Sequence, residues 1–446
     1  MTGPSNTGPS NTGPSNVAQA GVWRPTAALA RALGCVAALL VLAVLFRRID
    51  LVALATPLLL GTAFGLLRRP YGAVSVRVRT RAASLLEAQR TDATVTVESA
   101  DYLDVVSVQL RTGQYLVGMH GQPRKCTSLL PGETHDVVLD LRATRWGRHS
   151  IGPAFVHAVA AHGLLRRGPF VAEPIRVTTL PLRDGFEATD VVPRAAGMVG
   201  LHRSRRPGEG TDIAGVRPFA VGDRLHRINW PVSMRAGELH VTSTLSDRDT
   251  DVVLVLDTQY DLGISEGIDG SSSSLDTAVR AAASIAEHYL RHGDRVGLID
   301  LGQAMRRVRP GAGRAHLVRL FDVLLDARPA RTGGITATMA LGEVPPGALV
   351  LMLSPLVGDS ALARAASLGR GGHSALVVDT LPDGAKPPRR SEWTDVAWRV
   401  WRLEREVDIG RLAELGVPVV TWSGAGSLDD VLRDVSRAAS APRALR

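Results

Sequence analysis

Two long apolar runs follow each other near the start of the chain and limit how it can fold. The first covers residues 26–46 and the second covers residues 49–67. Each has about the 20 residues that a helix needs to cross a bilayer. A cleaved signal peptide is the alternative for the first run, but no small-residue cleavage site separates the two runs. Residues 26–68 are therefore predicted to form two transmembrane helices in the lipid bilayer.

The arginines around these runs predict the orientation of the helical pair. They are Arg24 and Arg31 before or within the first run, Arg47 and Arg48 between the runs, and Arg68, Arg69, Arg77, Arg79 and Arg81 after the second. Positive residues favour the cytoplasmic side. We expect a multi-pass protein of the inner or plasma membrane, with both ends and all soluble domains in the cytoplasm.

Composition excludes some classes of protein. The chain has 446 residues and a formal net charge of +9, but its arginines are scattered and aromatic residues make up only 4%. Few aromatic side chains are available to stack on bases, so nucleic acid is not an expected partner. Cys35 and Cys126 are too few and too far apart to predict a disulfide framework or a metal-thiolate site. Residues 1–25, which hold three TGPSN repeats, are expected to be a disordered tail.

The region after the apolar runs changes its hydrophobic period once. Within residues 71–185, apolar and polar residues alternate and turn residues recur at short spacing, which predicts an antiparallel β-sandwich. Within residues 249–440, buried-type strands such as 251–258 alternate with amphipathic helices such as 275–289. This alternation predicts an α/β domain with a mostly parallel sheet and helices on both faces.

Residues 186–248 form an arginine-rich signature segment between these two domains. Its part GDRLHRINW is predicted to be a Gly-Asp turn followed by an extended stretch with Ile228 and Trp230 on one side. Two interpretations stay open. In one, Trp230 is a buried anchor and the Arg and Asp side chains pair to order the connection. In the other, the seven arginines between Arg203 and Arg235 form a docking surface for a partner.

This signature resembles that of the bacterial domain of unknown function 58 (DUF58) family. The matching or corresponding positions are Asp212, Arg217, Phe219, Gly222, Asp223, His226, Arg227, Ile228, Trp230, Ser233, Met234 and Arg235. His226 and Met234 depart from the family, which has Arg and Ala there. The resemblance implies that the α/β domain is von Willebrand factor A-like and that a MoxR-type AAA+ ATPase is the partner.

Because the α/β domain resembles von Willebrand A domains, its residues can be compared with the ligand positions of the metal site in those domains. Such sites take hard cations through oxygen ligands at the strand ends. Asp257 keeps the first ligand position, Asp261 replaces a serine ligand, and Thr336 matches the loop threonine. Because the serine ligands are lost, we expect a degenerate site and no cofactor, with Mg²⁺ as the possible ion.

The chain has no GxxxxGK(S/T), HExxH or CxxC motif of a known enzyme class. The sequence therefore predicts a non-enzymatic, membrane-anchored scaffold or adaptor for protein-protein interaction. One alternative is a divalent-metal-dependent receptor that uses Asp257, Asp261 and Thr336. Another is a hydrolase whose cleft gathers Asp223, His226 and Asp257.

Overall fold

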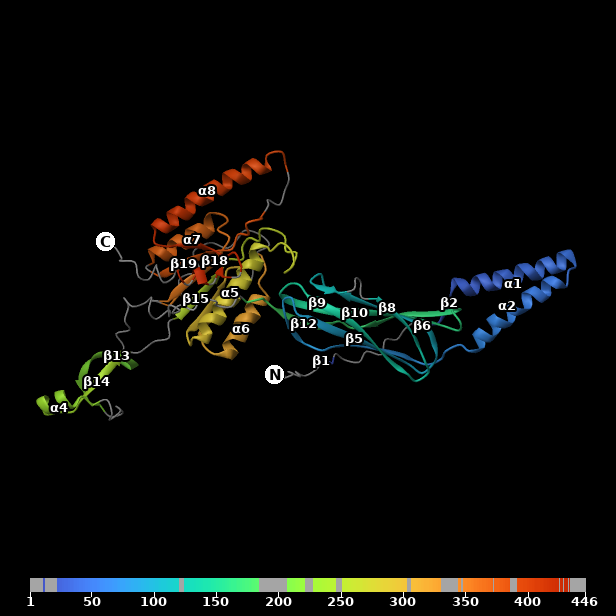
Figure 1. The fold of residues 1–446 in the computed structure, drawn as a ribbon, viewed down its shortest axis with the longest axis horizontal. Helices are drawn as coiled ribbons and strands as arrows, with labels where there is room; N and C mark the ends of the chain where they lie inside the picture. The colour runs from blue at the N-terminus through green and yellow to red at the C-terminus, as the bar shows by residue number, and fades with distance from the viewer. Residues whose placement is uncertain are drawn as a thin grey trace. The chain divides into compact units, whose positions relative to one another are not determined.

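The computed structural model of the chain separates into two compact units, Met1–Leu180 and Pro181–Arg446 (Figure 1). The structure describes residues 11–12, 22–119, 124–183, 207–220, 228–245, 251–302, 306–329, 344–345, 348–371, 373–385, 391–424, 426–427, 429–431 and 433.

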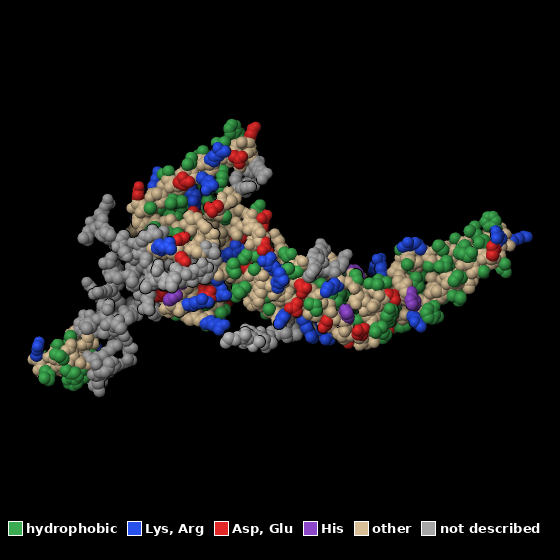
Figure 2. Space-filling model, in the orientation of Figure 1, with side chains coloured by type: hydrophobic (Ala, Val, Ile, Leu, Met, Phe, Trp, Pro, Cys, Tyr) green, Lys and Arg blue, Asp and Glu red, His purple; other side chains and the backbone are tan. Residues whose placement is uncertain are grey.

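The first unit contains two apolar helices, α1 (Ala27–Phe46) and α2 (Asp50–Leu67), which pack against each other. Both are long and apolar enough to cross a membrane, and only 17% of each apolar stretch is buried. A core helix of a soluble protein buries most of its surface, so these helices differ from that case. Figure 2 shows the many hydrophobic side chains on their surface.

The rest of the first unit is built from two sheets of mainly antiparallel strands. One sheet has the order β1-β3-β5-β9-β7; in the other, β2-β11-β10-β12-β4 is extended by β6 on β10 and by β8 on β6. The strands are β1 (Asn11–Thr12), β2 (Arg24–Pro25), β3 (Val74–Thr80), β4 (Ser84–Leu86), β5 (Arg90–Ser99), β6 (Leu103–Thr112), β7 (Leu116–Gly118), β8 (Arg124–Leu129), β9 (Thr134–Ala143), β10 (Gly147–Ala160), β11 (Leu165–Ala172) and β12 (Ile175–Leu180).

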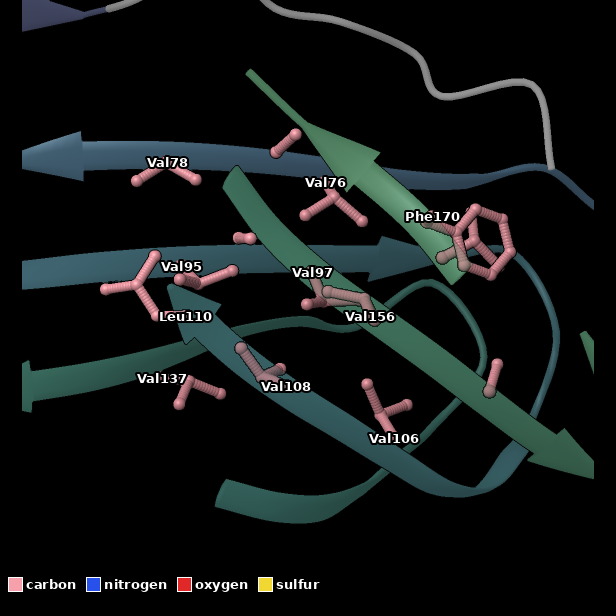
Figure 3. Packing of buried hydrophobic residues seen from close by; sticks show 14 of the residues in the cluster. Val76, Val78, Val95, Val97, Val106, Val108, Leu110, Val137, Val156 and Phe170 are labelled. Carbon is pink, nitrogen blue, oxygen red and sulfur yellow. The ribbon is translucent and has the colours of Figure 1, made fainter. Parts of the chain in front are cut away.

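Alternating residues of these strands meet in one hydrophobic core. Val76 and Val95 come from the first sheet, and Val108, Val156 and Phe170 come from the second; all belong to one buried cluster (Figure 3). The alternation that predicted an antiparallel β structure is thus the pattern that fills the core.

The two helices are joined to this β structure by the turn after β10. The backbone N–H of Thr26 donates to the carbonyl of Leu164 at 2.9 Å, and its hydroxyl donates to the carbonyl of Gly163 at 2.7 Å. Phe64 of α2 stacks on His162 of the same turn, with 6.1 Å between ring centroids. The start of α1 and the end of α2 are therefore both fixed to the β structure.

The second unit begins with the signature segment, in which β13 (Pro207–Pro218) pairs antiparallel with β14 (His240–Leu245). The short helix α4 (Trp230–Ala236) lies between them in the sequence. The larger sheet follows, with the order β17-β16-β15-β18-β19-β20. Its strands are β15 (Asp251–Leu256), β16 (Arg295–Asp300), β17 (Arg307–Gly311), β18 (Leu349–Ser354), β19 (Ser374–Asp379) and β20 (Val419–Thr421).

This sheet is parallel except for its edge strand β17, and helices cover both faces. Helices α5 (Ser274–Arg291) and α6 (Arg314–Leu325) pack together, as do α7 (Asp359–Arg370) and α8 (Thr394–Glu414). Figure 1 shows the two pairs on opposite faces of the sheet. The predicted parallel sheet is therefore present, but the antiparallel edge strand was not predicted.

Candidate functional site

The signature segment folds as a strand pair with an inserted helix. Val241 of β14 pairs with Arg217 on one side and forms an isolated β-bridge with Ile228 on the other. The backbone N–H of Asn229 then donates to the carbonyl of His240 at 2.8 Å. The segment thus returns to β14 immediately before α4 begins.

Two polar side chains hold α4 against β14. The side-chain oxygen of Asn229 accepts from the backbone N–H of Val232 at 3.2 Å, which caps the helix, and its amide donates to the Thr242 hydroxyl at 3.3 Å. The buried Ser233 hydroxyl donates to the carbonyl of Asn229 at 2.8 Å and accepts from the backbone N–H of His240 at 2.8 Å. Gly237 ends the helix with a φ of 74°.

The interpretation of Trp230 as a buried anchor is wrong, because its side chain is 61% exposed. The extended stretch ends at Asn229 and Trp230 is the first residue of α4, so the expected alternation with Ile228 does not continue. Met234 follows one helical turn later and is 82% exposed. Residues four apart share one face of a helix. Trp230 and Met234 therefore form an exposed apolar face, which we call the α4 face, and exposed Arg235 adjoins Met234 in the sequence.

The remaining signature residues are placed in part. Asp212 lies on β13, and Arg217 on the same strand donates to the carbonyl of Pro218 at 3.1 Å. Gly222, Asp223, His226 and Arg227 lie outside the described residues. The predicted docking role of the arginines and the hydrolase cleft with Asp223 and His226 stay predictions.

A second polar cluster lies where the parallel strands of the large sheet end. Asp257 directly follows β15, while β16, β18 and β19 end at Asp300, Ser354 and Asp379, and all four residues are buried. The carboxyl ends of parallel strands are the usual place for a ligand site in an open α/β sheet.

The predicted metal ligands Asp257 and Asp261 accept hydrogen bonds from different groups. One carboxylate oxygen of Asp257 accepts from the Ser354 hydroxyl at 2.6 Å, and the other accepts from the backbone N–H of Gln259 at 3.3 Å. Asp261 instead accepts from the hydroxyl of Ser274 at 3.2 Å and from the backbone N–H of Leu275 at 3.0 Å, at the start of α5. Thr336 lies outside the described residues. Within the part of the chain that the structure describes, no group of three or more His, Cys, Asp or Glu residues is arranged to hold a metal.

Asp300 is a carboxylate of this cluster that the sequence prediction missed. Burial raises its pKa, while the hydroxyl of Thr258, which donates to it at 2.6 Å, and the backbone N–H of Gly302 at 3.0 Å oppose the rise. The nearby charge of Arg306 also lowers the pKa, and that of Asp257 raises it. A side chain at Gly302 would collide with the Thr258 hydroxyl, so this position requires glycine.

Asp379 is held by an arginine from α8. Arg405 contacts its carboxylate at 2.6 Å, with 10% and 8% of the two side chains exposed. The same guanidinium donates to the carbonyl of Pro355 at 3.0 and 3.2 Å. Sequence reasoning also missed this pair. Asp300 and Asp379 could have been found in the sequence as acidic residues at the ends of buried strands, in GLID and VVD.

The fold and the signature define a chain whose first unit holds two apolar helices and an antiparallel β structure. Its second unit holds the signature and a mostly parallel sheet with helices on both faces. Residues 215–384 match the family described as "Protein of unknown function DUF58". This match covers the α4 face and all four residues of the polar cluster at the strand ends, and it supports the resemblance predicted from the signature.

Relatives of this chain occur in mycobacteria. An uncharacterized protein of Mycobacterium tuberculosis is 27% identical over 306 residues, which are 66% of this chain and 86% of that protein. An uncharacterized protein of Mycobacterium bovis gives the same identity and coverage, 27%, 66% and 86%. Neither name assigns an activity.

Two solved structures resemble part of the chain. A CARDB domain of Pyrococcus furiosus in complex with di-metal ions has 14% identity and a TM-score of 0.19, covering 25% of this chain and 90% of that domain. A cohesin module of a Clostridium perfringens family 33 glycoside hydrolase has 9% identity and a TM-score of 0.19, covering 26% of this chain and 100% of the module. Likeness at this level carries no argument about function.

Proposed function

We propose that the chain is a membrane-anchored, non-enzymatic scaffold that binds a partner protein through the α4 face. The observation that carries the proposal is the exposure of Trp230 and Met234 on a helix whose base is fixed by Asn229 and Ser233. Exposed Trp on a rigid support is typical of the residues that dominate binding energy in protein interfaces. The exposed Arg235 adds a cation of the kind that steers association.

The rest of the proposal comes from the resemblance and from the helices. The resemblance implies a MoxR-type AAA+ ATPase as the partner and a von Willebrand factor A-like fold for the α/β domain. The sheet order with a single antiparallel edge strand supports that fold assignment. The two apolar helices support anchoring in the bilayer.

The test is capture of the ATPase by the full chain from detergent-solubilised membranes, with and without ATP analogues. We expect the double variant Trp230→Ala/Met234→Ala to lose capture and to keep its melting temperature, because both side chains are exposed. The matched control is Val318→Ala, which truncates an exposed apolar residue of α6. Capture that is equal in all three proteins would contradict the proposal.

A divalent-metal-dependent receptor is the second candidate, favoured by the carboxylates of Asp257 and Asp300 at adjacent strand ends. The Asp257 oxygens already accept hydrogen bonds from Ser354 and Gln259, and Asp261 supports α5. We therefore expect Mg²⁺ to leave the melting temperature unchanged, in the parent and in Asp257→Ala. A Mg²⁺-dependent increase in the parent that Asp257→Ala abolishes would favour the receptor.

A further inference from the structure

Helix α8 carries apolar residues on two faces, and within the part of the chain that the structure describes only one of them packs on its own domain. On the inner face, Leu412 is buried in the hydrophobic core and Arg405 forms the buried pair with Asp379. Trp398 and Trp401 are half-buried on the same side and stack with 4.6 Å between ring centroids. These contacts fix which face of α8 points outward.

The outward face carries a regular apolar row that we call the outer stripe. It consists of the N-cap residue Trp393 and of the helical residues Val396, Val400, Leu403 and Val407, which are between 49% and 72% exposed. The steps between them are three, four, three and four residues. This is the a/d repeat of a coiled coil, with Trp393, Val400 and Val407 at a and with Val396 and Leu403 at d. Figure 2 shows green side chains among charged ones on the surface of α8.

The residue types in the outer stripe favour a coiled coil of two parallel helices. Val at a combined with Leu at d is the combination that selects a parallel dimer. Val400 and Val407 occupy a positions on either side of Leu403 at d. Gly410, at the next d position, offers no side chain and so ends the row.

The charges beside the outer stripe fit a second copy of the same helix. The g positions are Arg399 and Glu406, and the e positions that follow each by five residues are Glu404 and Arg411. In a parallel coiled coil, a g residue faces the e residue five positions later on the other chain. Both pairs then join opposite charges, Arg399 with Glu404 and Glu406 with Arg411.

We propose that the outer stripe binds the outer stripe of a second copy of this chain, as a short parallel two-stranded coiled coil. Arg411, which contacts Asp408 at 3.0 Å within its own helix, turns to the Glu406 carboxylate of the second copy. An anionic membrane surface fits this face less well, because the two arginines and two glutamates beside the outer stripe cancel and such surfaces select an excess of Lys and Arg.

Cysteine crosslinking of the full chain tests the pairing directly. The exposed Cys35 and Cys126 are first replaced by Ser. In that background, Val400→Cys places identical a positions opposite each other, so we expect oxidation to give a covalent dimer. The matched control is Arg402→Cys, which is also exposed but lies at a c position away from the seam, and we expect it to give no covalent dimer. A dimer formed equally by both, or crosslinking only between Val400→Cys and Leu403→Cys in a mixture, overturns the parallel arrangement.

Charge reversal beside the outer stripe supplies a second test, which is read out by the same Val400→Cys crosslink. Arg399→Glu puts two glutamates opposite each other and should abolish the Val400→Cys crosslink, while Arg399→Glu/Glu404→Arg should restore it. Leu403→Glu should also abolish it and leave the melting temperature unchanged, since Leu403 is exposed. If Leu403→Glu keeps the parent's crosslinked fraction, or if the double reversal fails to rescue the single one, the second copy is not the occupant.

Discussion

Asn229, Trp230 and Ser233 lie in one five-residue stretch of the signature, yet their side chains have different roles. Asn229 and Ser233 satisfy backbone groups of α4 and β14 and are at least partly buried. Trp230 contributes little to that packing and presents its ring to solvent. The polar residues of the signature are therefore expected to determine stability, and the aromatic residue is expected to determine binding.

Ser233→Ala should destabilise the second unit. It removes the acceptor of the His240 backbone N–H, and an unsatisfied buried group of this kind costs about 1–3 kcal/mol. Trp230→Ala, at an exposed site, should change the free energy of unfolding by no more than about 0.5 kcal/mol. Denaturant unfolding and hydrogen exchange at the His240 amide measure both effects. A larger loss for Trp230→Ala than for Ser233→Ala would restore the anchor interpretation.

Asp300→Asn should stabilise the α/β domain at neutral pH. The amide oxygen of Asn can accept the same hydrogen bonds from Thr258 and Gly302, and the variant has no charge to desolvate. Because burial raises the pKa of Asp300, the native protein loses stability as the pH rises through the folded-state pKa. The advantage of the variant should therefore grow with pH above the usual Asp range and vanish in acid. Melting temperatures across that range measure it, and a variant that is less stable at pH 7 would show that the carboxylate charge is needed.

At the scale of elements, the period of the hydrophobic residues predicts most of the helices and strands of this chain. Strand β15 and helix α5 could be predicted without knowing which elements lie beside them. A strand buried on both faces has a continuous apolar run, and a helix buried on one face has an apolar side. Strand β17 was not predicted because its sequence RVRPG has two arginines and a proline, and only the edge of the sheet accepts it. Helix α4 was not predicted, because a seven-residue helix depends on its Asn229 cap rather than on periodicity.

The Arg405–Asp379 pair joins residues of separate elements, so no local pattern predicts it.

Arg405→Leu should loosen α8 from the sheet. The substitution leaves the buried Asp379 carboxylate without its guanidinium partner, and breaking a buried pair in this way costs about 3–5 kcal/mol. We expect faster hydrogen exchange along α8 and a lower melting temperature. Arg402→Leu, at an exposed position of the same helix, serves as the control and should change neither. Equal exchange rates in both variants would mean that the packing of Leu412 alone holds the helix.

At the scale of the whole molecule, the proposed anchoring through α1 and α2 would tether the folded units to a membrane. Thr26 and Phe64 fix both ends of the pair to the turn at residues 161–164, so the β structure begins directly at the end of the helices. Anchoring of this kind would confine the α4 face and the outer stripe to a layer near the bilayer. Confinement to a layer raises the effective concentration of copies and partners.

The orientation of the helical pair decides which compartment these surfaces meet. Arg24 and Arg31 precede or enter α1, and five arginines from Arg68 to Arg81 follow α2, while Arg47 and Arg48 alone lie in the turn between the helices. Because positive residues near helix ends are retained on the cytoplasmic side, we expect a reporter fused to the C-terminus to be active only when it functions in the cytoplasm. A fusion in the turn after Arg48 should give the opposite result. If the C-terminal reporter is active only outside the cytoplasm, a MoxR-type ATPase has no access to the α4 face, and the proposed partner must be replaced by one from outside the cell.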